Sequence, residues 1–355
     1  MNTEIDNRHR EVLAAIIDTY LTTESAVGSR TLVKACNLDY SPATVRNVMA
    51  DLEDAGLIGQ PHVSAGRIPT TTGYRLYVDT LMKSASLDDS WRNRISRGLL
   101  EQSFDFSVAA QVSAEVIAEL SGCAAIVESA SMDLGHLEQL ELMPAGDNAL
   151  MMMAVDAHGV VRSGLLGASN RSRGDLQLIS HLMRTAFGSL EGPCDSIERK
   201  ELLSRALGTE NQEFIDEVWE IGRRVIDFRP GDLHVSGIDN LLEQPEFQSI
   251  GRARRIISLM NDRARLSSFI DKASAPFSPT RNPRVIIGEE LGVDEAADCS
   301  MIITHYSVGG ASTGRMGIVG PKRMPYSELI ELLRLVSGEM EKNTWRRGSR
   351  REFGK

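Results

Sequence analysis

Cysteine is scarce in this chain, with four residues among 355. The four thiols are scattered along the sequence at Cys36, Cys123, Cys194 and Cys299. They show neither the paired spacing of a zinc site nor the density of a secreted disulfide scaffold. We expect buried thiols in a protein of the reducing cytoplasm.

Long apolar runs are also lacking. The most apolar stretch, residues 149–155, is far shorter than the ~20 residues that cross a bilayer. Residues 1–10 are polar and have no apolar core of the kind found in a signal peptide. The sequence therefore predicts a cytoplasmic protein with no membrane partner.

Positive charge is in deficit, with 39 Lys and Arg against 49 Asp and Glu and a net charge of -10. This balance excludes a protein that coats nucleic acid indiscriminately. Residues 1–83 alone carry eight Lys and Arg against ten Asp and Glu. We expect DNA contacts to be local and the affinity of each arm to be modest, so that specific binding depends on a dimer engaging two half-sites.

The C-terminal tail, residues 342–355, has the opposite character. Its cations are Lys342, Arg346, Arg347, Arg350, Arg351 and Lys355. Such a basic run is usually a solvated chain end. The alternative hypothesis is that it supplies the phosphate charge that residues 1–83 lack.

Signatures of catalysis and of cofactor binding are missing. Adjacent Glu289 and Glu290 would point to opposite faces of a strand, which suits neither acid–base work nor chelation. The glycine-rich SVGG at 307–310 lacks the lysine and the strand-to-helix setting of a phosphate cradle. Five histidines are isolated from one another and from the cysteines: His136, His158, His181, His234 and His305. We predict no catalytic residue, no cofactor and no metal.

Helical periodicity dominates the N-terminal region. Residues 8–21 place Val12, Ile16 and Tyr20 on one stripe, and residues 29–36 repeat the pattern. Ser41-Pro42 opens a third helix, because Ser is a preferred N-cap and Pro suits the first helical position. Three short helices in this order are a helix-turn-helix candidate.

A hairpin follows the third helix. The segments LIGQ and RIPT flank the small polar stretch HVSAG, which suits a hairpin tip. A hairpin at this position is a wing, and Thr71 or Thr72 can cap a fourth helix after it. Residues 1–83 therefore predict a winged helix-turn-helix DNA-binding domain, and residues 84–100 a linker helix.

The third helix carries the candidate base contacts, because the second helix of a helix-turn-helix enters the major groove by its N-terminal residues. Arg46 can bind guanine bidentately and Asn47 can pair with adenine. The hydroxyls of Ser41 and Thr44 suit phosphate, and Ala43 lies on the same face. The alternative is a solvated helix face with ordinary capping.

The wing offers a second set of candidate contacts. Its tip, which includes Ser64, is small apart from His62 and Arg67, so it could press against the DNA backbone or place Arg67 in a minor groove. An ordinary hairpin is the alternative. On the fourth helix, Arg75 either contacts phosphate or covers the exposed side of that helix.

Beyond the linker, helical patterns alternate with strand patterns. Residues 91–120 are helical, residues 123–167 contain four strand-like segments, and residues 175–272 are mostly helical with one strand at LHVSG. Three further strands and a closing helix end the chain. Strands on both sides of a helical block indicate an α+β domain that carries an insertion.

These motifs resemble the heat-inducible transcription repressors called HrcA. The strings that carry the resemblance are VGSRTL, YSPATVRNVMADLEDAGLIGQPHVSAGRIPTTTGYRLYVD, LHVSGIDNLLEQPEF and VIIGEE…CSMIITHYSVGG…GRMGIVGPKRMPYSELI. They cover nearly the whole chain. Ala26 stands where a Pro is common in the family, and Val63 stands where a Thr is common.

The resemblance implies a multidomain α+β protein with a winged helix, a GAF-like α/β domain over 101–188 and 276–341, and an inserted α+β dimerisation domain over 189–275. It further implies a homodimer that binds double-stranded DNA at the inverted-repeat CIRCE operator of chaperone operons of the groESL and dnaK type. The chaperonin GroEL would assist the repressor into its active form, and repression would lapse on heat shock.

Two other classes of function remain open on the residues alone. One is a ligand-sensing winged-helix regulator, because GAF-like domains often hold small molecules. The other is a winged-helix protein-interaction module, which the weak charge of residues 1–83 favours and the polar face with Arg46 and Asn47 opposes.

Overall fold

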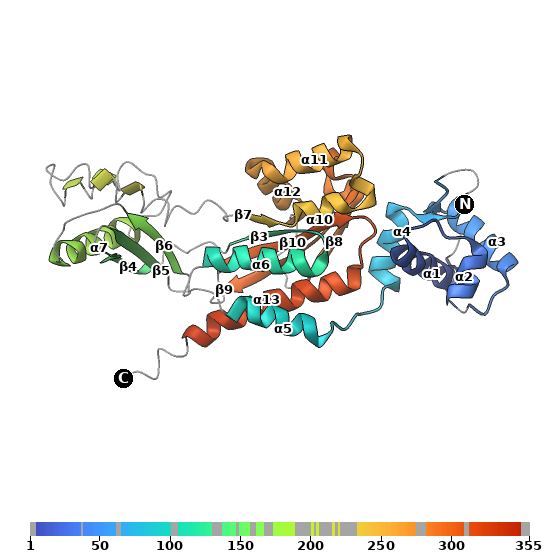
Figure 1. The fold of residues 1–355 in the computed structure, drawn as a ribbon, viewed down its shortest axis with the longest axis horizontal. Coiled ribbons are helices and arrows are strands. Elements are labelled where there is room, and N and C mark those ends of the chain that lie inside the picture. The colour runs from blue at the N-terminus through green and yellow to red at the C-terminus, as the bar shows by residue number, and fades with distance from the viewer. Residues whose placement is uncertain are drawn as a thin grey trace.

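The computed structural model describes residues 5–36, 38–61, 65–100, 106–129, 137–146, 149–156, 161–166, 173–188, 233–274, 282–308 and 312–348, with short helical pieces at 200–201, 204–205, 215–216 and 219–220. Three bodies follow one another along the long axis of the molecule (Figure 1). A helical body with a small hairpin lies at one end, an α/β body occupies the middle, and a smaller α/β body lies at the other end.

The N-terminal body is a winged helix. It contains α1 (Asn7–Thr23), α2 (Ser29–Cys36), α3 (Pro42–Asp54), the strands β1 (Ile58–Gly59) and β2 (Ile68–Pro69), α4 (Thr71–Leu76) and the π-helical turn η1 (Tyr77–Leu81). The predicted periodicity is confirmed, since Ile16, Leu32 and Leu52 are fully buried together. The fourth helix is capped by Thr70, one residue before the predicted pair, because the Thr70 hydroxyl accepts a hydrogen bond from Gly73 N at 3.1 Å.

The central body is built on a five-stranded antiparallel sheet in the order β7-β3-β10-β9-β8. Its strands are β3 (Ala124–Glu128), β7 (Leu233–Ser236), β8 (Arg284–Ile287), β9 (Cys299–Val308) and β10 (Ser312–Pro321). Alternate residues of β3 enter two different cores, Ala125 and Val127 on one face and Ala124 and Ile126 on the other. Both faces are therefore covered, which explains why β3 is a continuous apolar run in the sequence.

Helices cover the two faces of this sheet unequally (Figure 1). One face carries α6 (Phe106–Ser121) and α13 (Tyr326–Gly348), with α5 (Asp89–Leu100) packed against both. The other face carries α10 (Ile238–Glu243), α11 (Ile250–Asn261) and α12 (Arg263–Ser274) with three short 3₁₀ turns, η4 (Pro245–Phe247), η5 (Gly288–Leu291) and η6 (Asp294–Ala296). Because α5 belongs to this body, the connection from the winged helix is the extended segment 82–88 and not a helix over 84–100.

The third body has its own antiparallel sheet, β4-β5-β6, formed by β4 (Leu137–Pro144), β5 (Leu150–Asp156) and β6 (Val161–Leu166). The helix α7 (Arg173–Gly188) packs on it, and its Ser180 hydroxyl accepts a hydrogen bond from Leu142 N at 2.8 Å. The methionine-rich strand β5 is central, and Met152 is fully buried.

The expected division of the C-terminal region is corrected by this topology. We expected residues 101–188 in the larger domain and residues 189–275 in the insertion. In the structure, β4, β5, β6 and α7 form a separate body and do not belong to the five-stranded sheet, whereas α10, α11 and α12 pack on that sheet. The described elements β4, β5, β6 and α7 therefore lie in the chain between β3 and β7, two strands that pair directly with each other.

Candidate DNA-binding surface

The N-terminus of α3 is tightly specified. Ser41 Oγ accepts a hydrogen bond from Thr44 N at 3.0 Å and lies 2.9 Å from Thr44 Oγ1, and Pro42 occupies the first helical position. Val45 and Leu52 on the opposite stripe are buried in the core. This cap and this stripe hold the helix in one rotational setting.

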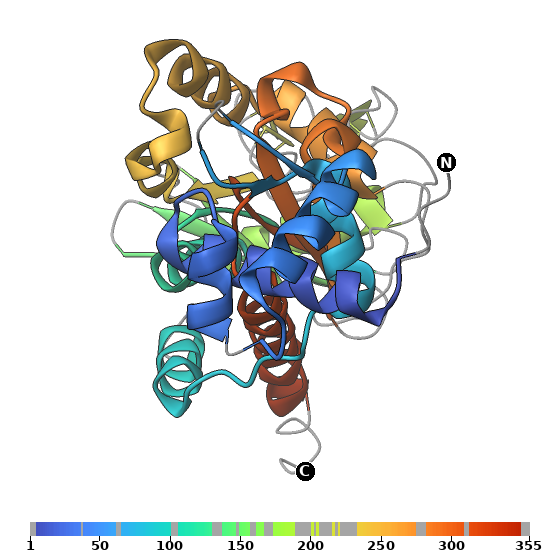
Figure 2. The same ribbon diagram turned by 90° about the vertical axis from the view of Figure 1, so that its right-hand side faces the viewer.

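The face of α3 away from the core is exposed and polar. The exposed residues include Ser41, Ala43, Arg46 and Asn47, and Thr44 is half-buried. Among the described residues, Arg46 has no carboxylate within ion-pair distance and Asn47 has no side-chain hydrogen bond. In Figure 2 the winged helix faces the viewer, with its blue helices in front of the central sheet.

The wing is short and is anchored at its base. Ile58 pairs with Pro69 and Gly59 with Ile68, while Val27 and Arg67 exchange backbone hydrogen bonds of 2.8 and 2.9 Å. His62 and Ser64, the predicted tip contacts, lie outside the described residues. This isolated bridge joins the base of the wing to Val27, which lies between α1 and α2.

Arg67 turns back toward α3 in the structure. Its Nε donates to Glu53 Oε2 at 2.9 Å, and a second guanidinium nitrogen lies 2.7 Å from the same oxygen. The predicted insertion into a minor groove would require this pair to separate. As it stands, Arg67 sets the distance between the wing and the recognition helix α3.

Arg75 contacts the central body in this structure, so a phosphate contact, one of its two predicted roles, would require these bonds to be released. Its guanidinium donates to Val285 O at 2.7 Å, to Glu290 Oε1 at 2.9 Å and to Asp79 Oδ1 at 3.1 Å. Burial opposes its charged form, but the hydrogen bonds that Arg75 donates to Glu290 and Asp79 outweigh burial and raise the pKa of Arg75. Sequence reasoning missed this role because Glu290 lies 215 residues away along the chain.

Further contacts between the winged helix and the central body were also missed. Arg323, which is also bound by Glu246 within the central body, donates to Glu24 Oε1 of the winged helix at 2.9 Å. Lys322 Nζ donates to Thr71 Oγ1 at 3.2 Å. Residues 24 and 323 are 299 positions apart, so no local pattern points to the pair. These contacts and those of Arg75 set the orientation of the winged helix in this structure.

Other kinds of site receive little support in the described part of the chain. No group of three or more His, Cys, Asp or Glu is placed to hold a metal ion there. Cys123 and Cys299 are buried free thiols and Cys36 is half-buried, while Cys194 lies outside the described residues. No described helix combines the length and apolar character needed to cross a membrane.

Comparisons with known proteins match both the N-terminal and the C-terminal part of the chain to family models. Residues 4–81 match the family described as "Winged helix-turn-helix transcription repressor, HrcA DNA-binding". Residues 109–330 match the family described as "HrcA protein C terminal domain". The heat-inducible transcription repressor HrcA of Moorella thermoacetica is 32% identical over 94% of this chain and 96% of its own length. That of Clostridium perfringens strain 13 is 31% identical over 95% of this chain and 98% of its own length.

A solved structure described as a hypothetical protein at 2.2 Å resolution shares the fold. It covers 95% of this chain and 98% of its own, with a TM-score of 0.69 at 18% identity. The arrangement of three bodies therefore recurs in a distant sequence.

Proposed function

This chain belongs to the HrcA family of heat-inducible transcription repressors, and from that premise we propose that it binds the inverted-repeat CIRCE operator of chaperone operons as a homodimer. The family consists of transcription repressors and not of enzymes. One observation carries the proposal: α3 presents Arg46 and Asn47, exposed and without partners among the described residues, beside a wing.

Base recognition falls to α3. Arg46 would donate two hydrogen bonds to the O6 and N7 acceptors of guanine, and Asn47 would bind N6 and N7 of adenine. Ser41 and Thr44, at the helix N-terminus, would meet phosphate, while Ala43 allows close approach to the groove floor. His62 and Ser64 of the wing tip remain proposed backbone contacts.

Arg67 is proposed as the residue that positions the wing, through its pair with Glu53. A guanidinium held in this way keeps a fixed distance between the α3 contacts and the wing contacts. Arg75 is not proposed as a DNA contact, because the central body holds its guanidinium.

Dimerisation is proposed for the inserted body, and the GAF-like assignment for the central body. Leu165 on β6 is 69% exposed and Leu178 on α7 is 54% exposed, so this body presents apolar side chains that a partner could cover. Two arms are needed because the charge balance of residues 1–83 gives each arm a modest affinity.

The regulatory part of the proposal follows the family. GroEL would bring the repressor to its active form, and unfolded proteins that occupy the chaperonin on heat shock would end repression. Marginal stability of a protein of this kind makes such chaperonin dependence reasonable. Because the operator lies on the chromosome, we place the protein in the cytoplasm.

Binding of the purified chain to a CIRCE-like inverted repeat and to a scrambled duplex tests the proposal, with and without chaperonin, at several salt concentrations. Selective binding is expected, with a loss of about tenfold or more in Arg46→Ala. Arg92→Ala, which removes an exposed arginine on α5, is the matched control and should bind as the parent does.

Salt-sensitive binding without selectivity contradicts the repressor proposal. The absence of binding even with chaperonin does so too, and it favours the protein-interaction module. Deletion of residues 344–355 tests the tail: a smaller dependence of binding on salt is expected if its cations contact phosphate.

A further inference from the structure

One stretch of this acidic chain is strongly basic. Residues 249–265 hold five arginines and a single acid, Asp262, in a chain whose net charge is -10. The arginines are Arg252, Arg254, Arg255, Arg263 and Arg265. They belong to α11 and to the start of α12, which cover one face of the central sheet (Figure 1). A local excess of positive charge on an acidic protein indicates a partner of negative charge.

Two of these arginines, Arg254 and Arg255, are free to meet such a partner. Both are exposed, while the opposite side of α11 is buried in the core of the central body. No carboxylate lies within ion-pair distance of either guanidinium in the described part of the chain. Arg252 and Arg265, by contrast, are each paired with a neighbouring acid.

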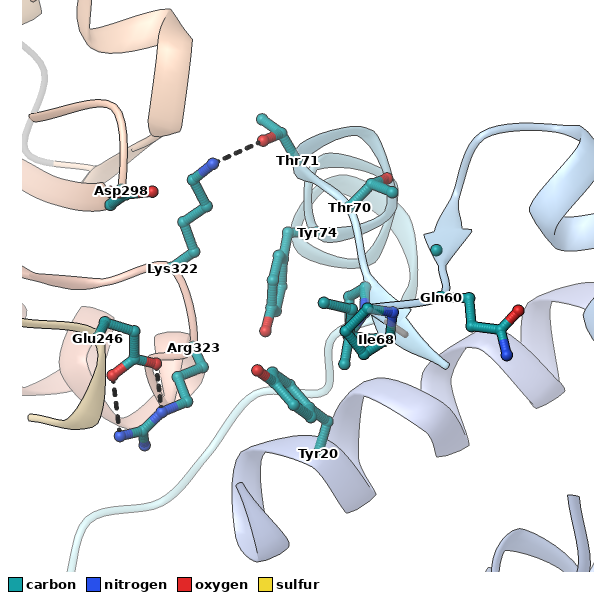
Figure 3. A pocket seen from close by; sticks show the side chains of 13 residues that line it. Tyr20, Gln60, Ile68, Thr70, Thr71, Tyr74, Glu246, Asp298, Lys322 and Arg323 are labelled. Atoms are coloured by element: carbon teal, nitrogen blue, oxygen red, sulfur yellow. Dashed lines mark hydrogen bonds and ion pairs between the residues drawn. The ribbon is translucent and has the colours of Figure 1, made fainter. Parts of the chain in front are cut away.

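The wing lies between the recognition helix α3 and the central body. At the base of the wing, Arg67 is bound to Glu53 of α3. On its other side, Gln60 lines a pocket between the winged helix and the central body, and the opposite wall of this pocket includes Glu246 and Asp298 (Figure 3). The central body next to the wing is therefore the part that carries these two acids.

The first turn of α11 adjoins this wall of the pocket. Arg252 donates to the Glu246 carbonyl at 3.4 Å, and its Nε lies 3.3 Å from Asp298 Oδ2. The two unpaired arginines of α11 follow within one turn of the helix. Arg263 begins α12, beyond the far end of α11, and a helix of 12 residues is about 18 Å long. The wing, the first turn of α11 and its two free guanidinium groups thus follow one another along one side of the molecule.

From this arrangement we infer that α11 is a second contact to DNA, in which Arg254 and Arg255 bind backbone phosphates of the operator duplex beyond the wing. A duplex that holds α3 in its major groove and meets the wing at the neighbouring backbone continues past the wing toward α11. Guanidinium groups suit phosphate, and such a contact reads no bases. It supplies positive charge that residues 1–83 lack. The inference rests on the proposed function, because its ligand is the operator duplex.

Fluorescence anisotropy of a labelled CIRCE-like inverted repeat with flanking sequence tests the inference, with the full chain titrated at several salt concentrations. The double variant Arg254→Gln with Arg255→Gln should bind more weakly than the parent. Its plot of log K against log salt should be less steep by about 2, because each phosphate contact contributes about 1 to this slope. A scrambled duplex should lose affinity by the same factor, so that selectivity stays unchanged.

The matched control is the double variant Arg92→Gln with Arg97→Gln. These arginines are exposed on α5, on the side of the central sheet away from α11, and neither has an ion-pair partner among the described residues. The control removes the same charge from another place and should keep the slope of the parent. Gln and Arg have similar helix propensities, so both double variants should melt as the parent does.

The possible outcomes separate this inference from the proposed function. Equal slopes in the α11 variant and a parent that still selects the operator overturn the inference alone, and an acidic protein would then be the partner of α11, which Ile250, 86% exposed, would also suit. Equal weakening in the α11 variant and the α5 control reduces the effect to net charge and overturns it too. A parent without selectivity but with a less steep slope in the α11 variant overturns the proposed operator and keeps the DNA contact. A parent that binds no duplex overturns both.

Discussion

The arginines of the winged helix show how one residue type takes different roles in one small domain. Arg67 is held by Glu53, Arg75 is held by Glu290, and Arg46 has no ion-pair partner among the described residues. A guanidinium that is already paired must lose that partner before it binds DNA, whereas Arg46 has no such cost. We therefore expect Arg46 to dominate specificity.

Tyr74 and Tyr77, three residues apart, allow a test of what a buried hydroxyl contributes with and without a hydrogen-bond partner. Tyr74→Phe removes a buried hydroxyl that has no hydrogen-bond partner among the described residues, so it should stabilise the fold by about 1 kcal/mol. Tyr77→Phe removes a hydroxyl that donates to Asp18 Oδ1 at 2.6 Å and should destabilise by about 1 kcal/mol. Urea unfolding followed by tyrosine and tryptophan fluorescence measures both, and shifts of the same sign would contradict the assignment.

The buried thiols should be almost inert at neutral pH. Burial raises the pKa of Cys123 and of Cys299 from 9.0 to about 12. Three pKa units correspond to about a thousandfold less thiolate at pH 8 than in the unfolded chain. Alkylation by iodoacetamide with peptide mapping should show that Cys123 and Cys299 react far more slowly in the folded chain than in the unfolded chain, with a rate that increases with pH until about pH 12. Fast labelling of these two thiols in the folded chain at pH 8 would refute the raised pKa.

At the scale of single elements, the cap of α3 stabilises the helix and is also proposed to contact DNA. A pair of variants separates these two roles. Ser41→Ala should cost about 1 kcal/mol of stability, because Ser41 caps α3, and should also weaken operator binding if Ser41 makes the proposed phosphate contact. Ser249→Ala removes the cap of α11 in the central body and should affect stability alone. Calorimetric melting and a gel shift provide the two readouts, and equal loss of DNA binding in both variants would refute a direct role for Ser41.

The elements themselves were largely predictable, because caps and periodicity are local. Ser41, Pro42 and the stripe of Val45 and Leu52 define α3 within 13 residues. The partners of Arg67 and Arg75 were not predictable, since an exposed arginine on a helix or hairpin gives no signal of which carboxylate lies opposite. The candidate site was therefore predicted where it depends on α3 and missed where it depends on tertiary contacts.

At the scale of the whole molecule, strand patterns did not reveal which strands share a sheet. β3 and β4 follow one another and both read as strands, yet β3 pairs with β7 and β10 while β4 pairs with β5. Pairing depends on contacts between segments more than 100 residues apart, as between Ala125 and Ser236. The insertion was accordingly predicted, but its boundaries were placed wrongly.

The orientation of the winged helix should depend on Glu290. Burial opposes ionisation of this carboxyl, but hydrogen bonds from Arg75 and Ile287 N outweigh burial, and its pKa falls below the ordinary value of 4.5. A lowered folded-state pKa means that the contact stabilises the fold above about pH 4.5 and is lost as the pH falls through the lower, folded-state value. Both side chains are partly exposed, so the pair contributes only about 1 kcal/mol.

Glu290→Gln should therefore free the winged helix without unfolding it. Limited proteolysis in the connection 82–88 should become about fivefold faster at pH 7. Loss of about 1 kcal/mol from the Arg75–Glu290 pair raises by that factor the population in which the winged helix is detached from the central body and the connection is accessible. Glu289→Gln is the matched control, since the neighbouring side chain is exposed and makes no contact with Arg75. As the pH is lowered through the folded-state pKa of Glu290, which lies below 4.5, cleavage of the parent should approach that of Glu290→Gln. If the two rates stay apart below that pKa, or if Glu289→Gln is cleaved as fast, the orientation is held by Arg323 and Lys322 instead.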